Sequence, residues 1–197
     1  MIIKAIKLTK KKVVTVAVLA LFAVVAVSAA PPAAKAVFSA AVAKNERLLP
    51  IYCVETDKPQ IAISFDAAWG ADDTDMLLEI LKENDVKATF FMCGYWVTKY
   101  PTEVQKIAAA GHDLGNHSAT HPHMSQLNSE QIAEELTTTG DKVKELTGVD
   151  MSLFRAPFGE YTNEVISTAK ECGYYTIQWD VDTLDTNIQY KSLGFFH

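Results

Sequence analysis

The stretch Ile63-Ser-Phe-Asp-Ala-Ala-Trp-Gly70, ISFDAAWG, is the part of the sequence that decides the fold class. The apolar run over residues 60–65 ends in one carboxylate, Asp66, and a glycine follows four residues later. Residues 72–85 begin with acids, and apolar side chains recur there at helical spacing, at Met76, Leu77, Ile80 and Leu81. A short apolar run, a turn and an amphipathic helix predict one βα unit, with Asp66 at the carboxyl end of its strand.

The same alternation continues to residue 182. Further strands are expected at 86–94, 112–118, 152–157 and 174–182, and further helices at 101–111, 128–148 and 162–173. A short edge strand is also expected at 49–54. Strands that alternate with helices of ten to fifteen residues are typical of an α/β fold with a parallel sheet. In such folds functional side chains collect at the carboxyl ends of the strands.

The first 36 residues have the composition of an export signal. Five lysines occur by position 12, residues 13–30 are uncharged and mostly apolar, and small residues and prolines follow. We expect residues 1–36 to be a cleaved signal peptide or an N-terminal membrane anchor, with 13–30 as the tether. Residues 37–57 are then a connector and residues 58–197 the domain. The domain is expected to be exported, in the cell wall or facing outward from the membrane.

The charge excludes one class of partner. The formal net charge is −6, and removal of residues 1–36 with their six lysines would take it to −12. A strongly acidic domain lacks the basic patches that bind nucleic-acid phosphates, and it is repelled by anionic membrane surfaces. A neutral or partly cationic substrate fits this charge better.

The three cysteines do not form a motif. Cys53, Cys93 and Cys172 are widely spaced and contain no C-x-x-C pair, which argues against a zinc knuckle or a redox motif. Cys93 and Cys172 adjoin apolar runs and are interpreted as small core residues. One disulfide after export remains an open alternative.

Polar side chains that follow the expected strands form the candidate site. They are Asp66, His117, His121, Arg155, Asp180, Asp182 and Asp185. Two histidines four residues apart on one helical turn can bind a single metal ion, although a bare H-x-x-x-H is more often a pair of surface histidines. A carboxylate beside a metal can act as a general base. Arg155 is expected to pair with Asp66, either to support that chemistry or as a structural ion pair.

Four segments resemble a known family when they are taken in order. ISFDAAWG, HSATHPHM, RAPFG and WDVDTLD are similar to the motifs of the polysaccharide deacetylases of the NodB-homology, carbohydrate-esterase type. The likeness covers residues 48–190 and is greatest to the sporulation-associated branch. It implies a distorted (β/α) barrel and N-deacetylation of peptidoglycan N-acetylglucosamine or N-acetylmuramic acid, or of chitin-like oligomers. The implied cofactor is a divalent metal: zinc, cobalt or manganese.

The resemblance also implies a role for each matching residue. Asp66 matches the general base, His117 and His121 match metal ligands, and Arg155 matches the residue that orients the base. The backbone N–H of Phe158 would contribute to the oxyanion hole. Asp185 matches an aspartate of the charge network around the base and the acid.

Two departures from the family pattern bear on activity. Ala67 stands where the family has its third metal ligand, so a metal would be weakly held unless Asp72 or Asp73 substitutes. Thr186 replaces a tryptophan, and the strand that carries the acid histidine is absent before the last residue, His197. The domain is therefore expected to be truncated at its C-terminus. A catalytically impaired glycan-binding relative is the alternative to an active deacetylase.

Overall fold

The computed structural model of the chain describes residues 46–183. The chain divides into two compact units, 1–47 and 48–197, and every described helix and strand belongs to the second. The expected leader over residues 1–36, Asp185, Thr186 and His197 lie outside the described residues.

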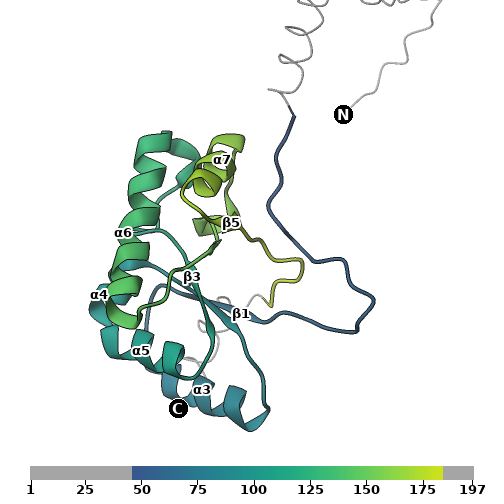
Figure 1. The fold of residues 1–197 in the computed structure, drawn as a ribbon, viewed down its shortest axis with the longest axis vertical. Coiled ribbons are helices and arrows are strands. Elements are labelled where there is room, and N and C mark those ends of the chain that lie inside the picture. The colour runs from purple at the N-terminus through teal and green to yellow at the C-terminus, as the bar shows by residue number, and fades with distance from the viewer. Residues whose placement is uncertain (1–45, 184–197) are drawn as a thin grey trace, which may run out of the picture. The chain divides into compact units, whose positions relative to one another are not determined.

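The centre of the domain is a sheet of five parallel strands in chain order, β1-β2-β3-β4-β5 (Figure 1). The strands are β1 Ser64–Ala67, β2 Thr89–Met92, β3 Asp113–Asn116, β4 Leu153–Phe154 and β5 Tyr175–Thr176. Ile51 forms a parallel bridge with Ile177 beyond β5, at the place where the sequence predicts an edge strand. Parallel strands in consecutive order confirm the predicted α/β class, since each connection must then contain a crossover.

Helices make these crossovers and cover the sheet. They are α3 Thr74–Glu83, α4 Gly94–Lys99, α5 Pro101–Ala109, α6 Ser129–Thr147 and α7 Asn163–Glu171, with 3₁₀ turns at Met124–Gln126 and Pro157–Gly159. The long helix α6 contacts α4, α5, α7 and strand β3 (Figure 1). Of the five α-helices within residues 46–183, the sequence pattern predicts four. The fifth, α4, has only six residues, which is too short for a helical period to show.

Helix α6 shows how the sequence sets the ends of an element. The Asn128 side chain accepts from the Gln131 backbone N–H, and the Gln131 side chain accepts from the Asn128 N–H, which forms a capping box. Gly148 ends the helix with φ of 75°, a left-handed conformation that glycine adopts without a Cβ clash. Between these ends Ile132, Leu136 and Val143, which recur at helical spacing, are fully buried.

Two sequence expectations need correction. The strand expected at 60–65 begins only at Ser64 and includes Asp66, because pairing with β2 starts where Thr89 donates to the Ile63 carbonyl. The apolar stripe of α3 is buried only in part: Leu81 is 5% exposed, whereas Met76 is 60% and Ile80 48% exposed. Helical spacing therefore identifies the helix but not which of its apolar residues reach the core.

At Gly115 we expect that the addition of one methyl group destabilises the fold. It lies in β3 beside Phe91, and an added Cβ would lie 2.4 Å from a ring carbon of Phe91. That ring cannot easily retreat, because the Arg155 guanidinium stacks on it at 4.0 Å from the centroid. Gly115→Ala is expected to lower the free energy of unfolding by about 1–3 kcal/mol.

Urea unfolding measures this difference, and Gly70→Ala is the matched control. Nothing lies within 4 Å of a Cβ added at Gly70, so its free energy of unfolding should change by no more than about 0.5 kcal/mol. Equal urea midpoints for the two variants would contradict the close packing of β2 against β3.

Candidate active site

An ion pair between Asp66 and Arg155 forms the centre of the candidate site. Asp66 lies in β1, and its Oδ1 accepts a hydrogen bond from Arg155 Nη1 at 2.7 Å. Arg155 follows β4 and is 5% exposed; its Nη2 donates to Ser64 Oγ at 2.8 Å and its guanidinium lies over the Phe91 ring. These partners fix the orientation of the buried guanidinium. It binds Oδ1 of Asp66, so Oδ2 is available for other contacts.

The backbone of Arg155 orients His117 as well. His117 Nδ1 lies 2.7 Å from the Arg155 carbonyl oxygen. A carbonyl only accepts, so Nδ1 carries the proton and the lone pair is on Nε2, which lies 3.8 Å from Asp66 Oδ2. Burial lowers the pKa of His117, which favours the neutral ring. This is the arrangement usual for a metal-binding histidine, whose second nitrogen is held by a carbonyl or carboxylate.

The two histidines lie in a loop, and the expected helical turn is wrong. Residues 117–121 are not helical, and Ser118 and His121 have φ of 67° and 57°. Side-chain acceptors stabilise this conformation: the Asn116 side chain accepts from the Ser118 N–H, and Ser118 Oγ accepts from the His121 N–H. The left-handed residues reverse the chain, so the two imidazole centroids lie 5.0 Å apart.

Residues of helices α6 and α4 form hydrogen bonds with the backbone of this loop. The Glu135 carboxylate accepts from the backbone N–H groups of Ala119 and Thr120, each at 2.8 Å. At the start of α4, the N–H of Gly94 donates to the Ser118 carbonyl at 2.9 Å. A Cβ at Gly94 would lie 3.0 Å from Ala119 Cα, so the close approach requires glycine there.

Aromatic rings surround His121. Its ring lies edge-on to that of Phe158 with centroids 4.6 Å apart, and the Trp69 ring, which is 76% exposed, lies 5.8 Å away. Burial, followed by the neighbouring His117 ring, lowers the pKa of His121, so it too is neutral at neutral pH. An exposed tryptophan beside a polar cluster is a surface on which an apolar sugar face can stack.

Phe158 contributes a ring that the sequence analysis did not anticipate. The residue has φ of 59°, and its ring stacks on that of His123 at 4.4 Å. His123 also lies 3.1 Å from the Glu160 carboxylate, and this contact, with Ser125, lowers the pKa of Glu160. The oxyanion role of the Phe158 N–H stays a prediction. The RAPFG motif assigns a role only to the backbone N–H of Phe158, so it does not predict the contacts of the Phe158 ring.

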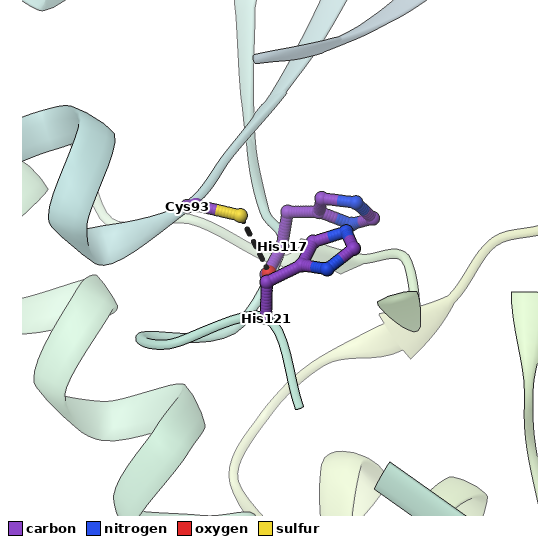
Figure 2. A group of neighbouring side chains, drawn as sticks. All are labelled: Cys93, His117 and His121. Atoms are coloured by element: carbon purple, nitrogen blue, oxygen red, sulfur yellow. Dashed lines mark hydrogen bonds between the residues drawn. The ribbon is translucent and has the colours of Figure 1, made fainter. Parts of the chain in front are cut away.

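Cys93 completes a cluster of metal-ligating atoms that the sequence analysis missed. One ligand atom from each of Cys93, His117 and His121 lies within 4.8 Å of the other two. Figure 2 shows the two rings side by side and the Cys93 sulfur directed at the His117 backbone, whose carbonyl accepts from the thiol at 3.3 Å. Burial raises the pKa of Cys93 to about 12, against a smaller lowering by Tyr95. A sulfur and two imidazole nitrogens form a donor set that suits zinc or cobalt, so these residues fit a divalent metal.

The remaining expected residues lie apart or outside. Asp72 and Asp73 do not belong to the described metal-ligating cluster; Asp73 instead precedes α3 as its N-cap. Asp180 and Asp182 are exposed beyond β5, and Asp185 lies outside the described residues. Cys53, Cys93 and Cys172 are all free thiols.

Comparison with known proteins identifies the family. The polysaccharide deacetylase profile matches residues 54–177. The uncharacterised protein YlxY of Bacillus subtilis is 40% identical over 136 residues, which are 69% of this chain and 43% of that protein. The peptidoglycan-N-acetylmuramic acid deacetylase PdaA of the same species is 31% identical over 144 residues, 73% of this chain and 55% of PdaA. The chain thus spans about half the length of the curated relatives it matches.

A solved structure gives the same result. A CE4 family pseudoenzyme from Bacillus anthracis superposes with a TM-score of 0.69 at 36% identity, over 71% of this chain and 50% of that one. A mutant of that pseudoenzyme is described as having restored enzymatic activity. The likeness confirms the NodB-type (β/α) barrel class and the family predicted from the four motifs. The chain belongs to the polysaccharide deacetylase family.

Proposed function

We propose that this chain is a metal-dependent hydrolase that removes acetyl groups from the N-acetylated glycan of the cell wall. The substrate class is peptidoglycan N-acetylglucosamine or N-acetylmuramic acid, or chitin-like oligomers. One observation carries the proposal: Arg155 binds Asp66 through its guanidinium and His117 through its carbonyl, and Asp66 Oδ2 lies 3.8 Å from His117 Nε2. A carboxylate and an imidazole lone pair held this closely are suited to act on one water molecule.

Each residue has a role in the proposed hydrolysis. Asp66 takes the proton of the attacking water, and Arg155 holds the carboxylate in position as it does so. The water oxygen adds to the acetyl carbon, and the proton held by Asp66 then passes to the amide nitrogen as the C–N bond breaks, so the products are acetate and a free amine on the sugar. The Phe158 N–H stabilises the negative charge that develops on the carbonyl oxygen. Asp185 is assigned to the charge network around Asp66.

A divalent metal belongs to this proposal, with His117 and His121 as ligands. When bound, it supplies Lewis-acid polarisation of the amide carbonyl and lowers the pKa of water. The neutral rings, whose pKa values are lowered by burial, keep their lone pairs available at neutral pH. Ala67 cannot ligate, so two histidines alone would hold zinc, cobalt or manganese weakly.

A catalytically impaired glycan-binding relative is the second candidate. Ala67 favours it, and so does the likeness to a solved CE4 pseudoenzyme at 36% identity. The exposed Trp69 beside His121 would serve sugar binding in either case. The two candidates differ in turnover and not in the glycan they recognise.

The proposed location is outside the cytoplasmic membrane. The leader-like residues 1–36 support export, with residues 13–30 as the proposed tether. Within residues 46–183, none of the helices has both the length and the apolar character that a bilayer span requires. The proposed partner is the cell-wall glycan, and the acidic net charge argues against a nucleic-acid partner.

Acetate release from N-acetylglucosamine oligomers or peptidoglycan tests the proposal. The purified 197-residue chain is expected to release acetate only after addition of zinc, cobalt or manganese, and His117→Ala should abolish that release. His123→Ala is the matched control, because His123 contacts Phe158 and Glu160 but lies outside the metal-ligating cluster. It should retain most of the activity. A folded chain that binds the oligomers but releases no acetate with any of the three metals would instead support the impaired relative.

A further inference from the structure

We infer that Cys93 replaces the carboxylate missing at Ala67 and serves as the third protein ligand to a divalent metal, beside His117 and His121. The inference rests on the metal site of the proposed function, but it does not require turnover. It predicts a sulfur-containing ligand set where the family pattern has a carboxylate.

The position of Cys93 in the sheet supports this substitution. Ala67 ends β1 and pairs with Met92, the last residue of β2. Cys93 is the next residue, and its N–H donates to the Ala67 carbonyl at 3.1 Å. The thiol therefore belongs to the same end of the sheet and to the strand adjacent to the missing carboxylate. Its sulfur lies within 4.8 Å of one ligand atom of each histidine, whereas Asp72 and Asp73 do not belong to that group.

The surroundings of Cys93 differ from those of an ordinary core thiol. Tyr95 follows it by two residues, and its hydroxyl oxygen is buried yet has no hydrogen-bond partner among the described residues. A buried donor without an acceptor is costly, and a metal-bound thiolate nearby would accept from it. The protein thus already holds a group able to stabilise sulfur in its ligating form.

Ligand chemistry makes the inference specific. Thiolate and imidazole favour zinc and cobalt, whereas manganese and magnesium favour oxygen ligands. The thiol must lose its proton to coordinate, and that proton passes to solvent as the cation binds. The hydrogen bond from Cys93 to the His117 carbonyl is then given up. The site is therefore expected to bind zinc and cobalt with a larger preference over manganese than an Asp-His-His site has.

Cobalt titration of the metal-free 197-residue chain tests the ligand set directly. We expect one equivalent of Co²⁺ to produce a near-ultraviolet band from thiolate-to-cobalt charge transfer. Cys93→Ser should lose this band. Loss of a residue that only hydrogen-bonds a metal ligand weakens metal binding by about 10–100-fold, and the loss of Cys93 should weaken cobalt binding by more than this. The double variant Cys53→Ser/Cys172→Ser is the matched control and should retain the band, since neither thiol belongs to the cluster.

The outcomes separate this inference from the proposed function. A charge-transfer band without acetate release would support Cys93 as a metal ligand and would contradict only the proposed hydrolase activity. Cobalt binding without the band, a band that persists in Cys93→Ser, or no cobalt binding at all would each overturn the inference. Tyr95→Phe gives a further readout: it should keep the band but weaken cobalt binding by about 10-fold.

X-ray absorption of the zinc-loaded Cys53→Ser/Cys172→Ser chain avoids any change at Cys93. We expect one sulfur at about 2.3 Å from zinc, with nitrogen or oxygen at about 2.0–2.1 Å. A shell of nitrogen and oxygen only would overturn the inference even if Cys93→Ser failed to fold.

Discussion

Asp66→Asn is expected to lower the rate of acetate release by about 10²–10⁴-fold, the contribution usual for a positioned general base. Asparagine has the same shape and still accepts a hydrogen bond from Arg155 at its oxygen, but it cannot take a proton from water. The Arg155 side chain is 6% exposed, and its guanidinium would keep Ser64 Oγ as a partner at 2.8 Å. The initial rate of acetate release at saturating metal measures the effect.

Ser64→Ala is the matched control for this change. It removes the other side-chain acceptor of Arg155 and leaves the carboxylate in place, so its rate of acetate release should fall by less than about 10-fold. Urea midpoints of both variants show whether the fold is retained. An Asp66→Asn variant that is folded and as active as the parent would remove Asp66 from the role of base.

Ala67→Asp is expected to raise zinc affinity by at least about 10-fold, and by about 100-fold when Cys93 is changed to serine. The new carboxylate would enter at the end of β1, where the Ala67 carbonyl already accepts from the Cys93 N–H. The gain in zinc affinity should be larger in the Cys93→Ser background. There the added carboxylate is the third protein ligand beside two histidines, whereas with Cys93 present it is the fourth, and a third ligand contributes more to affinity. Zinc titration by calorimetry measures all four combinations.

Ala62→Asp controls for added negative charge. Ala62 is exposed and precedes β1, so a carboxylate there should leave the zinc affinity within about 2-fold of the parent. If Ala67→Asp gives the same gain with and without Cys93, the two side chains do not serve one metal ion. A gain in affinity with a gain in acetate release would indicate that the missing carboxylate limits turnover.

Local sequence patterns predicted most of the elements. Helix α6 begins at a capping box, Asn128 with Gln131, and ends at Gly148; both signals act within a few residues and need no tertiary contact. The boundaries of β1 could not be predicted in this way, because the strand begins only where β2 offers a partner at Thr89. Helix α4 was missed because six residues do not show a period.

The site residues also divide into those that the sequence predicts and one that it does not. Asp66, His117, His121 and Arg155 were predicted from polar residues that follow strands and from the four motifs, and the structure brings them together. Cys93 also follows a strand, but it was interpreted as a core residue because a lone cysteine after an apolar run usually is one. Its place directly after β2, at the same sheet end as Asp66, is the sequence signal that points to the site.

Two properties of this protein were determined by the sequence alone: an α/β chain of the polysaccharide deacetylase family, and an alanine, Ala67, at the position where the family resemblance implies a metal-ligating carboxylate. Both follow from residue identity and order. The tertiary structure decided how the histidines reach each other, through left-handed residues at Ser118 and His121 rather than a helical turn. It also decided that Cys93 lies beside them, because pairing of β2 with β1 and β3 brings together residues far apart in sequence.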